Sequence, residues 1–483
     1  MRFQVIVLAA SVVGGFMWSP VCVGQWSGDP AANLVVADRS GPQVETKLAA
    51  TADGGFYLAW FDDSTGGYDV YLQRLDAAGV EQWAHNGVLV ADRSADGTMS
   101  WGLAVDAAGY AVLAFNDDRT GSDEITVARI DPNGTAVWGP SGVQVSSGGG
   151  FIAYPCVAGT SDGNIVVAWT QDDSVALQKL DPNGTPLWGS GVTLTPSTES
   201  FILNDVIAAD AGTVIVSFIH GGWEESHLWA QKLAATDGQL LWGVNHLVVF
   251  DALSLQTGYR PALASDGAGG AVVTWYTSIP LQCRVQHVLA DGAEAFAHQG
   301  VEVSTYVEGR RTNPSGAYLP ATGEVVVFWK EESPPNLFGV YGQKLDAFGE
   351  RQWGDTGREL VPLGVNEVDE VVTLPFADGA IVAWEDGVAW DNQPIRAARV
   401  DGNGDLLWPS GIIDLASSQT ENRQLVGAFG AAGFAAFAWA AGDTMSSDIL
   451  AQNLNGDGSL GSLIAFADGF ESGDTSAWSA TVP

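Results

Sequence analysis

The strongest constraint on the fold of this chain is a sequence motif that returns eight times. A full copy reads Gln178-Lys-Leu-Asp-Pro-Asn-Gly-Thr-Pro-Leu-Trp188, and a similar copy ends at Trp138. The copies lie 50 to 57 residues apart, measured between the central apolar residues Leu75, Ile130, Leu180, Leu233, Val288, Leu345, Val400 and Leu454. A repeat of this length is typical of chains in which each copy is one structural unit packed on the next.

Each copy follows a second recurring element, an apolar run that ends in an aromatic residue. These aromatic residues are Trp60, Phe115, Trp169, Phe218, Trp275, Trp329, Trp384 and Trp439. Glycine-bearing turns precede the runs and also lie inside the motifs, where they supply the positive φ angles of tight hairpins. Enrichment in valine, isoleucine and aromatic residues favours strands over helices. The pattern predicts four short antiparallel strands per repeat, which is one blade of a β-propeller.

We therefore predict an all-β chain, a β-propeller of eight four-stranded blades over residues 25–466, with seven blades as the alternative if one module is displaced. Residues 33–40 match residues 87–94, which form the fourth strand of a module, whereas the last module lacks a clear fourth strand. An N-terminal strand that joins the C-terminal blade would close the ring and remove its exposed edge.

The segment Leu233-Ala-Ala-Thr-Asp-Gly-Gln-Leu-Leu-Trp242 resembles the tryptophan-docking motif of eight-bladed quinoprotein propellers. The module as a whole is also similar to propeller repeats of exported bacterial proteins. The resemblance implies that one tryptophan per blade stacks on the neighbouring blade, with these candidates: Trp26, Trp83, Trp138, Trp188, Trp242, Trp353 and Trp408. It says little about function, because one fold hosts many activities.

Cysteine usage argues against a quinoprotein activity. Quinoproteins carry adjacent cysteines and a calcium–quinone site, and this chain has no Cys-Cys pair. Beyond residue 24 the chain has two cysteines, Cys156 and Cys283, and we expect them two modules apart. We interpret them as two separate buried thiols rather than as a disulfide.

The two ends of the chain do not follow the repeat. Residues 1–24 hold one arginine, an apolar run from Val5 to Trp18 and small residues near Gly24, which predicts a secretory signal peptide. We expect a secreted or cell-surface protein, with the periplasm as an alternative. Residues 467–483 form a C-terminal tail, either a sorting segment or a frayed terminus. No later apolar stretch reaches the ~20 residues of a membrane span, and we expect a monomer.

The acidic charge excludes some classes of partner. The chain has 57 Asp and Glu against 20 Lys and Arg, a formal net charge of −37, and yet 46% of its residues are hydrophobic. That apolar content is too high for a disordered acidic tail. The charge argues against nucleic-acid binding, which depends on neutralising phosphates.

Many acids fall in the loops between the second and third strands, which share one face with the connections between blades. Clustered carboxylates are the ligands that calcium prefers. The candidate calcium ligands are Asp62, Asp63, Asp117, Asp118, Asp172, Asp173, Glu385 and Asp386. The alternative is a solvated acidic rim in which the aspartates cap turns.

One loop holds a local cluster of histidines and acids, His220, Glu224, Glu225 and His227. The two histidines could face each other across a hairpin, as a zinc site or an acid–base pair needs. No second cluster supports such a site, so chance loop composition is the alternative.

Arginines recur in the connections between blades, at Arg39, Arg93, Arg260, Arg310, Arg311 and Arg423. Converging with Tyr259 or Tyr306 and an acid, they would suggest a sialidase-like pocket. The sialidase motif does not line up residue by residue, and ion pairs with the acidic loops explain the arginines more simply.

These patterns favour an exported, non-catalytic scaffold that binds a glycan, a protein partner or calcium at its loop face. The loop aromatics Tyr68, Trp101, Trp223 and Trp390 could stack on sugars or simply pack their loops. Two alternatives stay open: a glycoside hydrolase or lyase with its site at the central channel, which needs two converging carboxylates, and a structural envelope or matrix protein.

Overall fold

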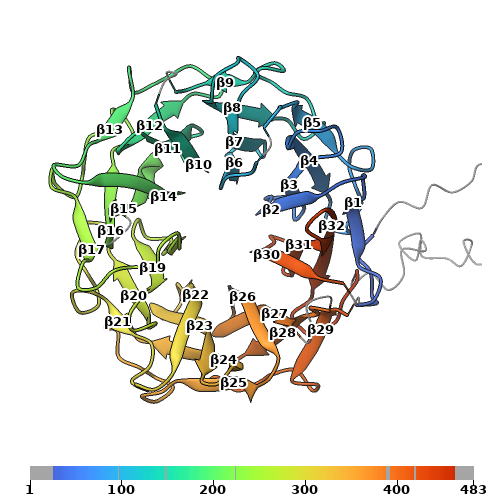
Figure 1. Cartoon of the computed structure of the whole chain (residues 1–483), viewed down its shortest axis with the longest axis vertical. Helices are drawn as coiled ribbons and strands as arrows, with labels where there is room; N and C mark the ends of the chain where they lie inside the picture. Colours follow the sequence, from blue (N-terminus) through green and yellow to red (C-terminus); the bar gives the residue numbers. More distant parts are fainter. Residues whose placement is uncertain are drawn as a thin grey trace, which may run out of the picture.

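The computed structural model describes residues 25–462 except 96, 147–149, 223–224, 388–391 and 418–419. Within these ranges the strands form eight four-stranded antiparallel sheets, arranged as the blades of a ring (Figure 1). The sole helix of the described part is a single 3-10 turn, η1 (Asp210–Gly212). The all-β propeller is thus confirmed with eight blades rather than seven. The predicted signal peptide and C-terminal tail lie outside the described residues.

Each blade contributes one strand to each of four concentric layers (Figure 1). The innermost strands of blades 1 to 8 are β2 (Gln43–Ala50), β6 (Gly102–Val105), β10 (Ile152–Gly159), β14 (Ser200–Ala208), β18 (Ala262–Ser265), β22 (Arg310–Leu319), β26 (Glu367–Phe376) and β30 (Asn422–Phe429). The second strands are β3 (Phe56–Asp62), β7 (Ala111–Asp117), β11 (Ile165–Gln171), β15 (Val214–Gly221), β19 (Ala271–Tyr276), β23 (Glu324–Ser333), β27 (Gly379–Gly387) and β31 (Ala435–Asp443).

The two outer layers continue the same order. The third strands are β4 (Asp69–Leu75), β8 (Glu124–Ile130), β12 (Ser174–Leu180), β16 (Ser226–Leu233), β20 (Cys283–Val288), β24 (Leu337–Leu345), β28 (Ile395–Val400) and β32 (Ser446–Leu454). The outermost strands are β5 (Val88–Ala91), β9 (Val143–Gln144), β13 (Val192–Leu194), β17 (Leu247–Phe250), β21 (Val301–Glu302), β25 (Arg358–Gly364), β29 (Ile412–Ala416) and β1 (Leu34–Ala37).

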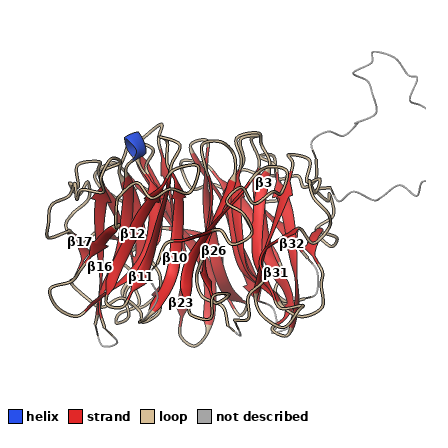
Figure 2. Cartoon of the chain, turned by 90° about the horizontal axis from the view of Figure 1, so that it is seen from above, coloured by secondary structure: helices blue, strands red, loops and turns tan. Residues whose placement is uncertain are grey.

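The second strands are buried on both sides because each sheet packs between two others (Figure 2). All seven residues of β3 are buried, and Trp60, Trp275, Trp329, Trp384 and Trp439 are among the largest fully buried side chains. A strand buried on both faces needs a continuous apolar run rather than an alternating one. The recurring aromatic residues therefore form packing between blades.

The ring closes between the two ends of the chain. Strand β1 pairs antiparallel with β32, with Leu34 opposite Ala451. The Asn33 amide donates to the Leu415 carbonyl at 2.9 Å and to the Gln452 side chain at 3.0 Å. The predicted N-terminal strand thus completes the last blade, and it satisfies an edge that would otherwise offer unpaired backbone groups.

The two faces of the ring differ in their connections. The hairpins that join first to second strands and third to fourth strands lie on one face, which we call the turn face. The other connections lie on the opposite side, the loop face. On the turn face, seven tryptophans each donate an indole N–H to a carbonyl of the next blade at 3.0 to 3.3 Å: Trp26, Trp83, Trp138, Trp188, Trp242, Trp353 and Trp408.

Basic side chains reinforce several of these blade junctions. Lys179 Nζ lies 2.9 Å from the Ala235 carbonyl, the same oxygen that accepts the Trp188 indole N–H, and 2.6 Å from Asp162. Four other carbonyls are shared in the same way, with Arg74, Arg129, Lys232 and Arg399 as donors. Blade 5 departs from the pattern, because Phe296 and His287 occupy these two positions. The junction of blades 5 and 6 therefore lacks both donors.

Two other predictions concern cysteines and membranes. Cys156 and Cys283 are both buried and unpaired, as expected. Among the residues that the structure describes, no helix has the length and apolar character to cross a membrane.

Candidate functional site

The eight candidate calcium ligands are divided among blades 1, 2, 3 and 7 and do not come together. Asp62, Asp117, Glu385 and Asp386 are buried. Nowhere in the described ranges do three or more His, Cys, Asp or Glu side chains form a group that could hold a metal ion. Calcium binding stays a prediction from the sequence.

The buried members of this set have partners within the protein. Asp62 accepts the Ser64 N–H at 2.9 Å and lies 3.6 Å from Arg39. Asp386 lies 3.0 Å from Arg396. Glu385 accepts the Leu425 N–H at 3.1 Å, and burial raises its pKa well above the usual range, with the Glu370 carboxylate adding to the effect. These acids accept hydrogen bonds from backbone N–H groups or form ion pairs with arginines of the protein.

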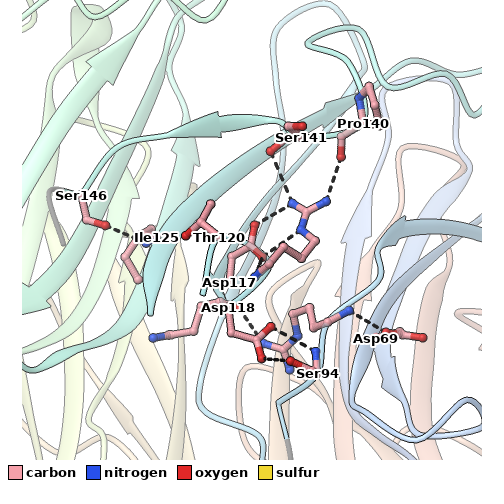
Figure 3. A network of polar contacts seen from close by, with 12 residues as sticks. Asp69, Ser94, Asp117, Asp118, Thr120, Ile125, Pro140, Ser141 and Ser146 are labelled. Atoms are coloured by element: carbon pink, nitrogen blue, oxygen red, sulfur yellow. Dashed lines mark hydrogen bonds and ion pairs between the residues drawn. The ribbon is translucent and has the colours of Figure 1, made fainter. Parts of the chain in front are cut away.

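The acids of blade 2 form a polar network with the loop that leads to it (Figure 3). Asp117 pairs with Arg119 at 2.6 Å, and Asp118 accepts the Ser94 hydroxyl at 2.5 Å. Burial works to raise the pKa of Asp117, but hydrogen bonds from Arg119 and Thr126 outweigh it, so the pKa lies below its ordinary value. This network holds the loops of blades 1 and 2 together.

The histidine cluster is arranged as a hairpin pair. His220 and His227 are directly opposite each other on β15 and β16. Their ring nitrogens have separate partners, however: His220 Nε2 lies 3.1 Å from the Thr198 carbonyl, and His227 Nε2 lies 3.3 Å from Glu225. Glu224 lies outside the described residues. A zinc or acid–base role for this cluster stays a prediction.

Asp172 and Asp173 line a cavity with a volume of about 400 Å³. It opens between blades 3, 4 and 5 on the loop face, and Phe151, Tyr154 and Arg260 also line it. A volume of several hundred Å³ is typical of small-molecule sites. We call this cavity the loop-face pocket.

The polar groups of the loop-face pocket are only partly satisfied by the protein. Asp172 accepts the Phe151 N–H at 2.9 Å, whereas the exposed Asp173 side chain has no hydrogen-bond partner within the described ranges. Arg260 stacks on Tyr154 with 4.5 Å between guanidinium carbon and ring centroid. One guanidinium nitrogen, Nη2, donates to the carbonyls of Leu203 and Asn204 at 2.5 and 2.9 Å.

Arg260 also differs from most arginines in the blade connections. Arg39, Arg310, Arg311 and Arg423 form ion pairs with Asp62, Glu332, Glu331 and Glu421, which confirms the simpler interpretation for these four. In the residues the structure covers, Arg260 has no carboxylate within ion-pair distance. The Arg260 charge acts on Asp205 from a longer distance and lowers the pKa of that acid against the effect of burial.

A second cavity, of about 290 Å³, lies along the inner strands, and we call it the channel cavity. Tyr259 and Arg260 line it together with Asn313 on β22 and Glu370 on β26. Burial raises the pKa of Glu370, and the carboxylates of Asp369 and Glu45 raise it further, while Lys47 lowers it. A carboxyl group held toward its protonated form beside a cavity is a frequent mark of functional sites.

The bulged residues of the inner strands are not among the residues that the sequence patterns single out. Residues with positive φ interrupt the register of five inner strands: Glu45, Tyr154, Asn313, Glu370 and Gln424. Bulges of this kind redirect a side chain. The one available signal was a proline inside an expected strand, at Pro155 and Pro314, because proline is confined to edges and bulges.

The whole chain is similar to known proteins in fold only. No protein-family model matches it, and a search of curated proteins finds no match. Similar solved structures include a prolyl endopeptidase (14% identity, 84% of this chain and 55% of the other, TM-score 0.44) and a puromycin hydrolase (14%, 87% and 61%, 0.42). A third is the polysaccharide lyase Uly1 (9%, 92% and 94%, 0.42).

The first two matches cover only part of the other proteins. The chain spans 55% and 61% of the length of the first two proteins. At such identities and scores the likeness says nothing of activity, substrate or partners. The fold assignment rests on the strand pairing of this chain.

Proposed function

We propose that this protein is an exported propeller scaffold that binds a glycan in the loop-face pocket. The observation that carries the proposal is the convergence of Asp173, Arg260 and the rings of Phe151 and Tyr154 on one cavity. A sugar offers hydroxyl groups to carboxylate acceptors and guanidinium donors, and its C–H face packs on aromatic rings. The pocket therefore offers each kind of contact that a sugar uses.

The charge of the protein narrows the class of glycan. At a formal net charge of −37, with Asp172 and Asp173 at the pocket, a highly anionic polymer would be repelled. A neutral glycan pays no such electrostatic penalty. We therefore propose a neutral, hydroxyl-rich ligand.

Two of the loop aromatics that suggested sugar stacking can be placed. Trp101 is buried, donates its indole N–H to the Glu45 carbonyl at 2.9 Å and packs on Phe61; Tyr68 is half-buried and packs against the same cluster. Trp223 and Trp390 lie outside the described residues. The proposal accordingly rests on Phe151 and Tyr154.

The test is a glycan array, followed by titration calorimetry with the best neutral hit. We expect Asp173→Asn and Arg260→Gln to weaken binding about tenfold or more, since each removes a charged hydrogen-bond partner. The matched control is Asp63→Asn, which changes a loop acid of blade 1 and should leave affinity unchanged. Absence of any glycan ligand, or equal losses in all three variants, would contradict the proposal.

A glycoside hydrolase acting at the channel is the second candidate. It is supported by Asp205 and Glu370, two acids of inner strands whose pKa values are both raised, chiefly by burial. A general acid must be protonated at the working pH. Release of reducing ends from the array hits by the wild-type protein, and its loss in Glu370→Gln, would replace the non-catalytic proposal with this one.

A further inference from the structure

The channel cavity and the loop-face pocket are neighbours. Tyr259 and Arg260 contribute to the walls of both. The Tyr259 ring is held against Tyr276 with 4.1 Å between centroids, and Arg260 is held by two carbonyls and by Tyr154. A ligand in the loop-face pocket that contacts Arg260 is thus next to the channel cavity.

The channel cavity contains polar groups that the protein itself does not satisfy. Neither the Asn313 amide nor the Glu370 carboxyl group has a hydrogen-bond partner in the part of the chain that the structure describes. Arg260 adds the nitrogens Nε and Nη1, for which the described residues provide no acceptor. Glu370 is exposed and Asn313 and Arg260 are half-buried, so these groups are open to solvent and can bond to a ligand that enters the cavity.

A second pair of residues in the same fold shows what these groups do when they are satisfied. Gln424 and Glu45 occupy corresponding bulges of blades 8 and 1, with φ of 59° and 57°. The Gln424 side chain accepts the Glu45 N–H at 2.8 Å and donates to the Glu45 carboxylate at 3.1 Å. Asn313 and Glu370 stand in the same relation in blades 6 and 7, but they enclose a cavity instead of bonding to each other.

The backbone supports a role for Asn313 and Glu370 beyond packing. Asn313 has a φ of 52° and Glu370 a φ of 24°, and both are L-residues held in a sparsely populated region. Such conformations cost about 1 kcal/mol or more and concentrate at binding sites. In blades 8 and 1 the hydrogen bonds between Gln424 and Glu45 offset the cost of this backbone conformation. Asn313 and Glu370 in blades 6 and 7 have no such bonds between them.

We propose that the channel cavity is a second subsite, which binds the terminal unit of a neutral oligosaccharide whose remaining units occupy the loop-face pocket. Asn313 and Glu370 bind the hydroxyl groups of that unit, and Arg260 contacts the chain between the two subsites. This inference rests on the proposed function in one respect, that the ligand is a glycan. It adds that the ligand is a chain rather than a single sugar.

The experiment is calorimetry with a length series of the best neutral glycan, from one unit to six. Affinity of the wild-type protein should rise about tenfold or more once the chain is long enough to enter the channel cavity. Glu370→Gln and Asn313→Ala should remove that gain and leave the affinity for short chains within about twofold. Glu45→Gln is the matched control, because Glu45 is the counterpart that is already bonded, and it should preserve the gain.

A cavity-filling variant, Asn313→Trp, provides a test that does not depend on losing a hydrogen bond. It should block long chains only, with thermal melting used to verify that the variant folds. If affinity is independent of length, or if Glu45→Gln and Glu370→Gln behave alike, the second subsite is wrong while glycan binding in the loop-face pocket stands. If the wild-type protein binds no glycan of any length, both proposals are wrong.

Discussion

The acids of the turn face and those of the channel are the same residue types, but their pKa values are shifted in opposite directions. On the turn face, the hydrogen bond from Lys232 lowers the pKa of Asp210, and that from Thr51 lowers the pKa of Asp53. In the channel, burial raises the pKa values of Asp369 and Glu370. Stabilised carboxylates add to folding stability, whereas carboxylates held toward protonation reduce it at neutral pH.

The two regions also differ in how regularly their side-chain contacts repeat. The turn face repeats its contacts from blade to blade, with a tryptophan on each of seven junctions and a basic residue on most of them. In the channel the bulges recur at corresponding positions of six inner strands, but the side chains that they carry differ from blade to blade. Groups that cost stability without an internal partner are typical of binding sites.

The largest predicted effect concerns the repeated face. Trp188 is buried and bonds to the next blade, so Trp188→Ala should lower the free energy of unfolding by about 3–5 kcal/mol. Trp188→Phe should cost only about 1 kcal/mol, the worth of the lost hydrogen bond, because Phe296 fills the corresponding place in blade 5. Urea unfolding measures both, and a neutral Trp188→Ala would show that the turn face does not stabilise the ring.

A smaller loss is expected at the glycines on which these tryptophans stack. A Cβ added to Gly292 would lie 2.7 Å from the Trp242 ring, at a φ of +86°. Gly292→Ala should therefore destabilise the protein by about 2–3 kcal/mol, from clash and backbone strain together. Gly243→Ala isolates the strain, because Gly243 has a φ of +90° and no atom within 4 Å of the added Cβ. Equal losses of unfolding free energy in the two variants would show that the close contact of Gly292 with the Trp242 ring does not matter.

The exceptional junction provides a gain-of-stability test. Phe296 lacks the indole N–H that the other seven blade junctions use. Phe296→Trp should raise the free energy of unfolding by about 0.5–1 kcal/mol if the added N–H finds a carbonyl on the turn of blade 6. Thermal melting measures the change, and a drop in melting temperature would mean that the junction of blades 5 and 6 is packed for phenylalanine.

The smallest effect is on the dependence of stability on pH, and it compares a turn-face acid with Glu385, a buried acid of β27 whose pKa the channel acid Glu370 helps to raise. Glu385 has a raised pKa when folded, so the folded state binds the extra proton and stability rises as the pH falls from the folded pKa toward about 4.3, the unfolded value. Glu385→Gln should flatten that rise in urea unfolding between pH 7 and pH 5.

The turn-face counterpart should show the reverse dependence. Burial works to raise the pKa of Asp162, but hydrogen bonds from Lys179 and Thr160 outweigh it, so the folded pKa is lowered. Its contribution is fully present above about 3.9, the unfolded value, and is lost as the pH falls through the folded pKa. Asp162→Asn should remove this acid sensitivity below pH 4. The same sign of slope in both variants would contradict the distinction between the two regions.

Much of the fold was predictable because its determinants are local. The apolar run before Trp60 and the turn glycines after Leu75 define strands and hairpins within one module, and the match of residues 33–40 to residues 87–94 predicted the ring closure that β1 and β32 make. The loop face was predicted less well. Asp62 and Asp117 were expected in loops, but they end the strands β3 and β7, where they pair with Arg39 and Arg119.

By itself, then, the sequence determined the number of blades, the order of strands within each and the positions of the tryptophans that bond to the next blade, because these repeat at a nearly constant spacing and need only contacts within a module or with the next one. Tertiary structure alone decided which side chains meet at the channel. Tyr154, Arg260, Asn313 and Glu370 belong to four separate modules; the bulges recur at corresponding positions of the inner strands, but the side chains that they carry differ from blade to blade. A site that depends on departures from the repeat leaves almost no signal in the repeat itself.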